Sequence, residues 1–277
     1  MEQYKLENSP IVYYISGREH RQWALFLHAA FVDHNMFRAQ VEGLQSDYNV
    51  LTLDLIGHGA STQTRRGDSI DKMSEWIFGI LQKEKIEKIH IVGVSLGAVI
   101  AQDFANRYPQ AVGSLACFGG YDINNFDARL QKDNGAAQGK MMLKAFLSVK
   151  WFAEANKKIS AFTPQAQQEF YEMNLRFPKK SFMYLASLGA MVNVHKTGKR
   201  NYPLLIGCGE RDIPGAKTAV EQWKEWEPEA TVVILEGAGH CVNMDVPARF
   251  HKLLEDFWSG RLPPLAPPMG QCRQPKR

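Results

Sequence analysis

The chain contains the segment Lys88-Ile-His-Ile-Val-Gly-Val-Ser-Leu-Gly-Ala-Val-Ile-Ala-Gln-Asp-Phe-Ala-Asn-Arg107, in which three elements follow one another. The β-branched run over residues 89–92 predicts a buried strand, and apolar residues at helical spacing after Gly97 predict a helix. Between them stands a Gly-x-Ser-x-Gly, Gly93 to Gly97. A serine at so sharp a turn adopts an unusual backbone conformation, and small residues two positions to either side let strand and helix approach. The segment therefore predicts that Ser95 is a nucleophile.

The composition bounds the class of protein. A length of 277 residues, with 45% hydrophobic and 22% charged residues, is typical of one large globular α/β domain with an insertion. The formal net charge is +4. Four basic residues and no acidic residue follow Gly260, so the rest of the chain is close to neutral. We therefore expect no nucleic-acid partner.

The cysteines and the apolar runs predict the compartment. Cys117, Cys208, Cys241 and Cys272 form no Cys-x-x-Cys pair, and the first two lie in apolar runs, where a buried free thiol is usual. The N-terminus has no apolar signal core, and no run is long enough to span a bilayer. Together these features predict a cytoplasmic protein without a membrane span. They predict no oligomeric state.

Strand and helix patterns alternate along the chain. Strands are expected at 10–15, 23–27, 49–55, 89–92, 112–118, 203–208 and 231–235, and helices at 34–44, 69–81, 98–105, 216–226 and 246–258. This alternation predicts an α/β fold, with a mostly parallel sheet covered by helices on both faces. Between about residues 124 and 200 only helical patterns occur, one through 141–147 and others over 151–159, 163–175 and 179–192. Thr163-Pro164 is the expected start of one of them.

The organisation that follows has three parts. Residues 1–122 and 201–260 are the expected α/β core, and residues 123–200 are the expected helical lid. Residues 261–277 are rich in proline, basic and aperiodic, which is typical of a disordered tail. A proline-rich ligand for a partner protein is the alternative for the tail.

A serine hydroxyl needs a base, and the base works better when a third group orients it. Asp212 and His240 each follow a predicted strand, as Ser95 does. The carboxyl ends of parallel strands meet at one edge of the sheet, so we expect the three side chains to meet there. The rival acid is Asp122, directly after the strand at 112–118. The predicted catalytic residues are Ser95, Asp212 and His240.

The oxyanion of an acyl-transfer reaction needs two N–H donors. Leu96, directly after the nucleophile, is the first predicted donor. The second is expected in the turn after the strand at 23–27; we assign it to Ala30, with Phe31 next in line. His28 and His58 are expected to brace turns, and the other histidines, among them His34 and His195, show no partner pattern.

No cluster of His, Cys and carboxylates has metal-ligand spacing, so no metal site is predicted. A Gly-x-Gly-x-x-Gly after the first strand is also missing, so no nucleotide cofactor is expected. The predicted lid is rich in methionine and aromatic residues, which favours an apolar pocket of adaptable shape. The predicted substrate-binding residues are Phe31, Met142, Phe146 and Trp151.

Five motifs together resemble the α/β-hydrolase fold family over roughly residues 10–258. They are Leu27-His-Ala-Ala30, Asp54-Leu-Ile-Gly-His-Gly59, Gly93-Val-Ser-Leu-Gly97, Gly209-Glu-Arg-Asp212 and Gly237-Ala-Gly-His240. One departure is Ala29, where many relatives have glycine; its methyl group narrows the turn but removes no N–H donor. The resemblance implies the Ser-Asp-His order of catalytic residues found in this fold.

Within that family, the residues favour a lidded serine esterase, lipase-like enzyme or lactonase acting on a small to medium apolar ester or lactone. Ser95 argues against dehalogenases and epoxide hydrolases, which carry Asp at that position. Carbon–carbon bond hydrolases of ring-cleavage pathways often carry Trp after the catalytic histidine, where this chain has Cys241. That activity stays as an alternative. A second alternative is a small-molecule receptor that keeps the triad and signals through a protein partner.

Overall fold

The computed structural model describes residues 1–126, 148–185, 187–195 and 200–262. The strands are β1 (Glu2–Lys5), β2 (Val12–Ser16), β3 (Trp23–Leu27), β4 (Asn49–Leu53), β5 (Ile89–Val94), β6 (Val112–Phe118), β7 (Leu204–Gly209) and β8 (Thr231–Leu235). They form one sheet in the order β1-β2-β4-β3-β5-β6-β7-β8. β2 pairs antiparallel with β1 and β4, and the remaining pairs are parallel.

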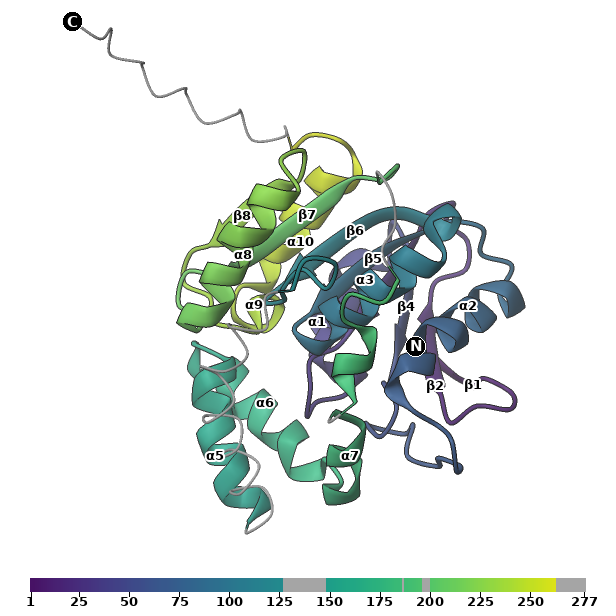
Figure 1. The fold of residues 1–277 in the computed structure, drawn as a ribbon, viewed down its shortest axis with the longest axis vertical. Helices are drawn as coiled ribbons and strands as arrows, with labels where there is room; N and C mark the ends of the chain where they lie inside the picture. Colours follow the sequence, from purple (N-terminus) through teal and green to yellow (C-terminus); the bar gives the residue numbers. More distant parts are fainter. Residues whose placement is uncertain (127–147, 186, 196–199, 263–277) are drawn as a thin grey trace, which may run out of the picture.

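The α-helices of the described residues are α1 (Arg38–Leu44), α2 (Met73–Lys83), α3 (Leu96–Arg107), α5 (Val149–Ser160), α6 (Pro164–Arg176), α7 (Phe182–Leu185), α8 (Pro214–Trp226), α9 (Val242–Asp245) and α10 (Pro247–Trp258). Short 3-10 helices are η1 (His34–Phe37), η2 (Ile70–Lys72), η3 (Pro109–Ala111), η4 (Lys179–Ser181) and η5 (Leu188–Met191). Figure 1 shows the sheet between helices on both faces.

Alternating side chains of the strands fill two apolar cores. Leu25 and Leu27 of β3 join the core under α2, α3 and α8, whereas Ala24 and Phe26 join the core under α1 and α10. In α2 the buried residues Met73, Ile77, Ile80 and Leu81 recur at helical spacing, so one face of the helix is apolar. This architecture confirms the predicted α/β fold with a mostly parallel sheet covered on both faces.

Between β6 and β7 the described residues form helices and no strand, as the sequence predicts. In Figure 1 helices α5, α6 and α7 lie together beyond one edge of the sheet. Thr163 caps α6 as predicted, because its hydroxyl accepts a hydrogen bond from the N–H of Ala166 (3.3 Å). The helical pattern through residues 141–147 and nearly all of the predicted tail lie outside the described residues.

The structure departs from the predicted elements at β1, over 179–192 and directly before the closing helix. β1 was not predicted, because Glu2, Gln3 and Lys5 give it a polar, exposed edge. The single helix expected over 179–192 is instead η4, α7 and η5, in a stretch where Ser187 and Gly189 are poor helix formers. The closing helix, expected over 246–258, runs from Pro247 to Trp258, and the short helix α9 that precedes it is not predicted.

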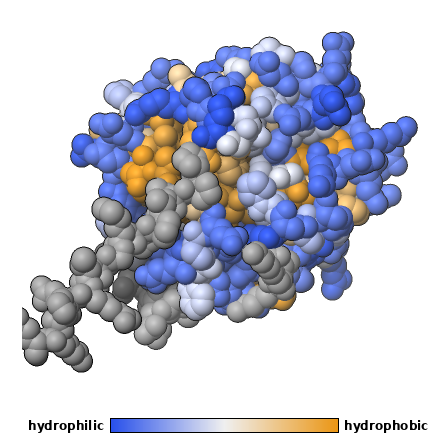
Figure 2. All heavy atoms as spheres, turned by 90° about the horizontal axis from the view of Figure 1, so that it is seen from above, coloured by the Kyte–Doolittle hydropathy of each residue, from blue (hydrophilic) through white to orange (hydrophobic). Residues whose placement is uncertain are grey.

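On the face seen in Figure 2, polar side chains surround an area where apolar side chains gather. The large apolar side chains that are most exposed in the described part of the chain include Met183 on α7, Trp226 on α8 and Ile234 on β8. Single exposed apolar residues are normal on a protein surface and decide nothing about partners.

Candidate active site

Ser95 lies at the tip of the turn between β5 and α3, with φ +55° and ψ −113°. Residues other than glycine rarely adopt this conformation. The turn is tight because a Cβ on Gly97 would lie 1.9 Å from the carbonyl oxygen of Leu27, and one on Gly93 would lie 2.4 Å from that of Gly97. Only glycine fits at these two positions, which is the packing that the sequence predicts.

Ser95 and His240 both lie against the carboxyl end of β6. The N–H of Ser95 donates to the carbonyl of Phe118 (2.8 Å). A Cβ on the next residue, Gly119, would lie 2.9 Å from Cε1 of His240, so the imidazole sits directly on that glycine. The end of one central strand thus brings together residues that are 145 positions apart in the sequence.

Asp212 lies beside the same imidazole, in the turn after β7. Its Oδ1 is 2.8 Å from Nδ1 of His240 and also accepts a hydrogen bond from the N–H of Ile213 (2.7 Å). The Asp212 side chain is fully buried, whereas that of His240 keeps 15% of its surface exposed. Because Nδ1 donates to the carboxylate, Nε2 is the nitrogen left to accept a proton.

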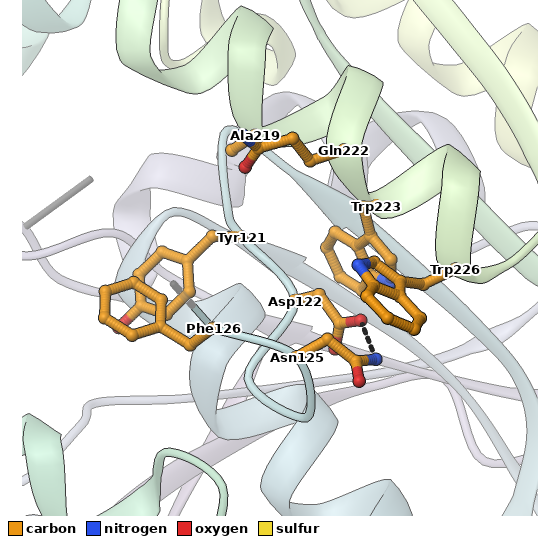
Figure 3. Close-up of a pocket in the computed structure, with 8 residues that line it drawn as sticks. All are labelled: Tyr121, Asp122, Asn125, Phe126, Ala219, Gln222, Trp223 and Trp226. Atoms are coloured by element: carbon orange, nitrogen blue, oxygen red, sulfur yellow. Dashed lines mark hydrogen bonds between the residues drawn. The ribbon is translucent and has the colours of Figure 1, made fainter. Parts of the chain in front are cut away.

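The rival acid, Asp122, is occupied elsewhere. Its Oδ1 accepts a hydrogen bond from the N–H of Asn124 and its Oδ2 from the side-chain amide of Asn125, both at 2.8 Å. Figure 3 shows this pair beside a small cavity of about 20 Å³ that Trp223 and Trp226 help to line. The geometry therefore favours Asp212 as the partner of His240, and the catalytic roles stay predictions.

The predicted oxyanion donors lie on two segments that touch. Leu96 is the first residue of α3, and the N–H groups of a first helical turn have no partner within the helix. The missing side chain of Gly97 faces the carbonyls of Leu27 and His28, so this turn of α3 packs on the turn that follows β3. There the N–H of Ala29 donates to Sδ of Met36 (3.4 Å). The N–H groups of Ala30, the predicted donor, and of its neighbour Phe31 stay the candidates for binding the oxyanion.

His28 braces the turn after β3, as the sequence predicts. Its Nε2 accepts a hydrogen bond from the N–H of Leu55 (2.9 Å), so its Nδ1 carries the proton and donates to the carbonyl of Ala29 (2.7 Å). Burial lowers the pKa of His28, which keeps the ring neutral in this role. His58 packs beside it, with ring centroids 5.1 Å apart, and burial lowers its pKa to about 3.

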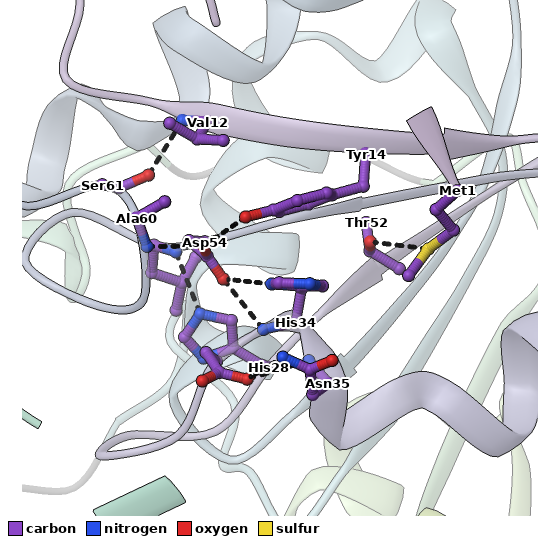
Figure 4. A network of polar contacts seen from close by, with 12 residues as sticks. Met1, Val12, Tyr14, His28, His34, Asn35, Thr52, Asp54, Ala60 and Ser61 are labelled. Carbon is purple, nitrogen blue, oxygen red and sulfur yellow. Dashed lines mark hydrogen bonds and ion pairs between the residues drawn. The ribbon is translucent and has the colours of Figure 1, made fainter. Parts of the chain in front are cut away.

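The structure also shows a polar cluster that no sequence pattern predicts. The buried carboxylate of Asp54 accepts hydrogen bonds from the backbone N–H and Nδ1 of His34, from Tyr14 and from the N–H of Ala60 (Figure 4). Burial by itself raises the pKa of Asp54, but the hydrogen bond and charge of His34 outweigh it and hold that pKa below its usual value. Twenty residues separate Asp54 from His34, so no local pattern connects them.

Phe31, a predicted substrate-binding residue, lies in a cluster of aromatic rings. Its ring packs against Phe152, Phe177 and Phe182 at centroid distances of 4.9 to 5.4 Å. Trp151 lies on α5 and is 52% exposed, whereas Met142 and Phe146 lie outside the described residues. A cavity of about 210 Å³ adjoins Phe31 and is lined also by Tyr14, His34 and Arg176. Their substrate-binding roles stay predictions.

Three further observations concern metal-ligand groups, thiols and membrane-spanning helices among the described residues. None of their His, Cys, Asp and Glu side chains form a group of three or more that could hold a metal ion. Cys117, Cys208 and Cys241 are buried free thiols, and burial raises the pKa of each. In this part of the chain every helix is too short or too polar to cross a membrane.

Comparison with known proteins agrees with the fold. The chain is 26% identical over 268 residues to monoacylglycerol lipase ABHD6 of Bos taurus, covering 91% of this chain and 80% of that protein. It is 23% identical over 252 residues to 3-oxoadipate enol-lactonase 1 of Acinetobacter baylyi, covering 88% and 91%. A thermophilic esterase from Thermogutta terrifontis superposes with a TM-score of 0.75 at 18% identity, covering 94% and 99%.

A family model also matches residues 24–247, and its description is the alpha/beta hydrolase fold. This match spans β3 to the start of α10 and so includes the turn at Ser95 and the loops of Asp212 and His240. The chain therefore belongs to the alpha/beta hydrolase fold family.

Proposed function

We propose that the chain is a serine hydrolase that cleaves carboxylic esters or lactones of small to medium apolar substrates. The observation that carries the proposal is the 2.8 Å contact between Asp212 and His240. His240 and Ser95, which is held at φ +55°, both lie against the carboxyl end of β6. Similarity to proteins named as a lipase, a lactonase and an esterase supports the class of bond.

In the first half of the reaction, Oγ of Ser95 forms a bond to the ester carbonyl carbon while Nε2 of His240 takes the hydroxyl proton. The N–H groups of Leu96 and Ala30 stabilise the oxyanion. The bond to the leaving oxygen then breaks, and His240 returns its proton to the departing alcohol. Asp212 keeps the imidazole oriented and stabilises its charged form.

In the second half, His240 takes a proton from water, and the resulting hydroxide attacks the acyl-serine. The bond between Oγ and the acyl carbon breaks, a carboxylic acid leaves, and Ser95 regains its proton from His240. In a lactone the leaving alcohol stays attached to the acid, so the product is one hydroxy acid. These steps use side chains, the two backbone N–H groups and water.

The organisation of the chain is part of the proposal. Residues 1–122 and 201–260 are the catalytic core, and residues 123–200 are a lid that supplies the apolar pocket. The helices of the described part of that insertion reach Phe31, next to the predicted oxyanion donor, which supports this role. A reducing compartment, the cytoplasm, fits the three buried free thiols.

The test is hydrolysis of p-nitrophenyl esters from acetate to dodecanoate by the wild type, by Ser95→Ala and by Ser114→Ala. Ser114 is the matched control, because it is a buried serine whose hydroxyl lies 2.8 Å from Nδ1 of His90 and it is far from the proposed site in the strand. We expect Ser95→Ala to lower turnover by roughly three orders of magnitude or more and Ser114→Ala to leave it near the wild-type value.

Near-normal turnover by Ser95→Ala would contradict the assignment. If the wild type turns over no ester but a fluorophosphonate still labels Ser95, the serine is activated for another substrate. Assays of lactone hydrolysis, of carbon–carbon bond hydrolysis and of ligand-dependent binding to a protein partner then separate a lactonase from the two alternatives, a carbon–carbon bond hydrolase and a receptor.

A further inference from the structure

Asp245, at the end of α9, joins the loop of His240 to the corner between α5 and α6. Its Oδ2 accepts a hydrogen bond from the N–H of Gly239 (2.8 Å), and its Oδ1 accepts bonds from the N–H and hydroxyl of Thr163 (2.7 and 2.9 Å). The N–H of Phe162 lies 3.0 Å from both oxygens. The residue is 8% exposed, so these donors take the place of water around the carboxylate.

The other neighbour of His240 is tied to the same corner. The N–H of Cys241 donates to the carbonyl of Ser160 (2.7 Å). A Cβ on Gly239 would lie 3.1 Å from the backbone nitrogen of Phe162, which shows how closely the two segments approach. The backbone on both sides of the predicted base is therefore held by the helical insertion.

The opposite end of α6 holds the turn after β3. Asn174 is fully buried and donates from its side-chain amide to the carbonyl of Phe31 (3.2 Å) and to that of Phe170 (3.0 Å). Its own oxygen accepts a hydrogen bond from Asn156 of α5 (2.8 Å). Phe31 has φ +70°, an unfavourable conformation for a bulky side chain, so its carbonyl needs a fixed partner to keep this orientation.

We infer that α6 holds two loops of the proposed catalytic site in place and that Asp245 and Asn174 are positioning residues. A helix of 13 residues is about 20 Å long, and α6 spans from the loop of the base to the turn of the predicted oxyanion donor. The inference rests on the proposed function, because it assigns roles to His240 and Ala30 through that function. It predicts that part of the insertion holds the reacting groups in place as well as covering them.

Two substitutions remove the contacts at the two ends of α6 separately. Asp245→Asn leaves one acceptor oxygen and turns an NH₂ donor toward backbone N–H groups, so the loop of His240 loses its anchor. Asn174→Ala removes the donor to Phe31 and leaves the amide of Asn156 without that acceptor. Thr163→Val is a milder third variant, which removes the hydroxyl contacts to Asp245 and to the N–H of Ala166 and keeps the carboxylate.

Each severe variant has a matched control. Asp256→Asn changes a carboxylate on α10 that binds Lys252 and Arg261 at the surface. Asn49→Ala removes a fully buried amide that clamps both the N–H and the carbonyl of His20 (3.1 and 2.7 Å). Asn49 is the first residue of β4, so it lies at the edge of the sheet opposite to the proposed site.

The experiment measures kcat and KM for the best ester, the rate of fluorophosphonate labelling, and amide hydrogen exchange on the full chain. We expect Asp245→Asn and Asn174→Ala each to lower kcat and the labelling rate ~10- to 100-fold with little change in KM, because displaced reacting groups slow the chemical step. Exchange should rise at residues 237–243 in the first variant and at 28–34 in the second. Thr163→Val should show the changes expected for Asp245→Asn to a smaller extent. The two controls should show neither the kinetic changes nor the changes in exchange.

Unchanged kcat and unchanged exchange in folded Asp245→Asn and Asn174→Ala would overturn the inference. So would exchange that rises throughout the chain with KM and kcat worsening together, because that is general destabilisation. If the wild type is neither active nor labelled, the proposed function fails by itself. The exchange comparison then still decides whether α6 holds the two loops.

Discussion

Ser95 combines an unfavourable backbone conformation with tight packing on both sides. Residues held at φ near +55° cost free energy and persist only when their surroundings fix them. Here the fixing contacts are the backbone approaches at Gly93 and Gly97 and the hydrogen bond from the N–H of Ser95 to Phe118. The predicted reactivity of Ser95 therefore depends on the absence of a Cβ at Gly93 and Gly97, where a side chain would clash with the backbone.

The first prediction concerns Gly97. In Gly97→Ala the new methyl group would meet the carbonyl of Leu27 at 1.9 Å, and neither backbone can yield without moving β3 or α3. We expect the free energy of unfolding to fall by roughly 3 kcal/mol and esterase activity to be lost. Gly79→Ala in α2 is the control: its methyl group meets Leu6 at 3.7 Å, so it should stabilise the helix by up to ~1 kcal/mol. Urea denaturation gives the free energy of unfolding of both variants. Equal changes in the two would contradict the expected clash between the new methyl group at residue 97 and Leu27.

The second prediction separates the two candidate acids. Asp212→Asn should lower kcat by roughly three to four orders of magnitude, because an amide at this position favours the wrong tautomer of His240. Asp122→Asn should leave kcat near the wild-type value, because its carboxylate bonds only within its own turn among the described contacts. Steady-state kinetics on one ester measures both variants. A large loss in Asp122→Asn with little loss in Asp212→Asn would reverse the assignment.

At the scale of elements, four phenylalanines fasten the helical insertion to the core. Phe31, from the turn after β3, packs edge-on against Phe152 of α5 and Phe177 after α6, and Phe182 of α7 completes the cluster. Phe152 and Phe177 are buried. Aromatic pairs in this geometry add to the stability that comes from apolar burial alone.

The third prediction tests that attachment. Phe152→Ala leaves a cavity between α5 and the core, and we expect it to lower the free energy of unfolding by roughly 3 to 5 kcal/mol. Hydrogen exchange should rise over 149–160 and around residue 31. Met183→Ala on α7, where the side chain is 67% exposed, is the control and should change neither. An exchange pattern identical to the wild type in Phe152→Ala would show that the cluster does not hold the insertion.

Elements with a clear period could be predicted from the sequence, and those without one could not. The buried strands and α2 follow from apolar runs and helical spacing, because burial alone determines them. β1 shows no such run; it forms because its backbone pairs with β2, in a register from Glu2 opposite Ile15 to Lys5 opposite Val12. The short helix α9, which carries Asp245, is also missed, because four residues are too few for a sequence period to mark it.

At the scale of the whole molecule, the predicted triad could be inferred because parallel strands end at one edge of the sheet. Ser95, Asp212 and His240 follow β5, β7 and β8, and the fold brings their loops together. The supporting contacts could not be predicted in this way. Asp245 bonds to Thr163 and Asn174 to Phe31 across 82 and 143 positions, between a loop and an insertion whose docking no local pattern encodes.

The last prediction concerns the pH dependence of stability. Burial lowers the pKa of His58 to about 3 and that of His90 to about 4. An unfolded histidine has a pKa of about 6.5, so between that pH and about pH 4 the unfolded chain binds protons that the folded chain does not. The free energy of unfolding should therefore fall as the pH falls through this range, and it should be fully restored above about pH 7.

His90 is the group to change, because it lies in β5 beside Ser114 and Trp258 and away from the loop of His240. In His90→Gln the slope of unfolding free energy against pH near pH 5 should be smaller by close to one proton, about 1.4 kcal/mol per pH unit at most. Urea denaturation at several pH values between 4.5 and 7.5 gives this slope independently of any constant loss of stability in the variant. A slope equal to that of the wild type would mean that His90 takes up its proton without unfolding, and acid sensitivity would then rest on the other described histidines whose pKa burial lowers, His28, His58 and His251.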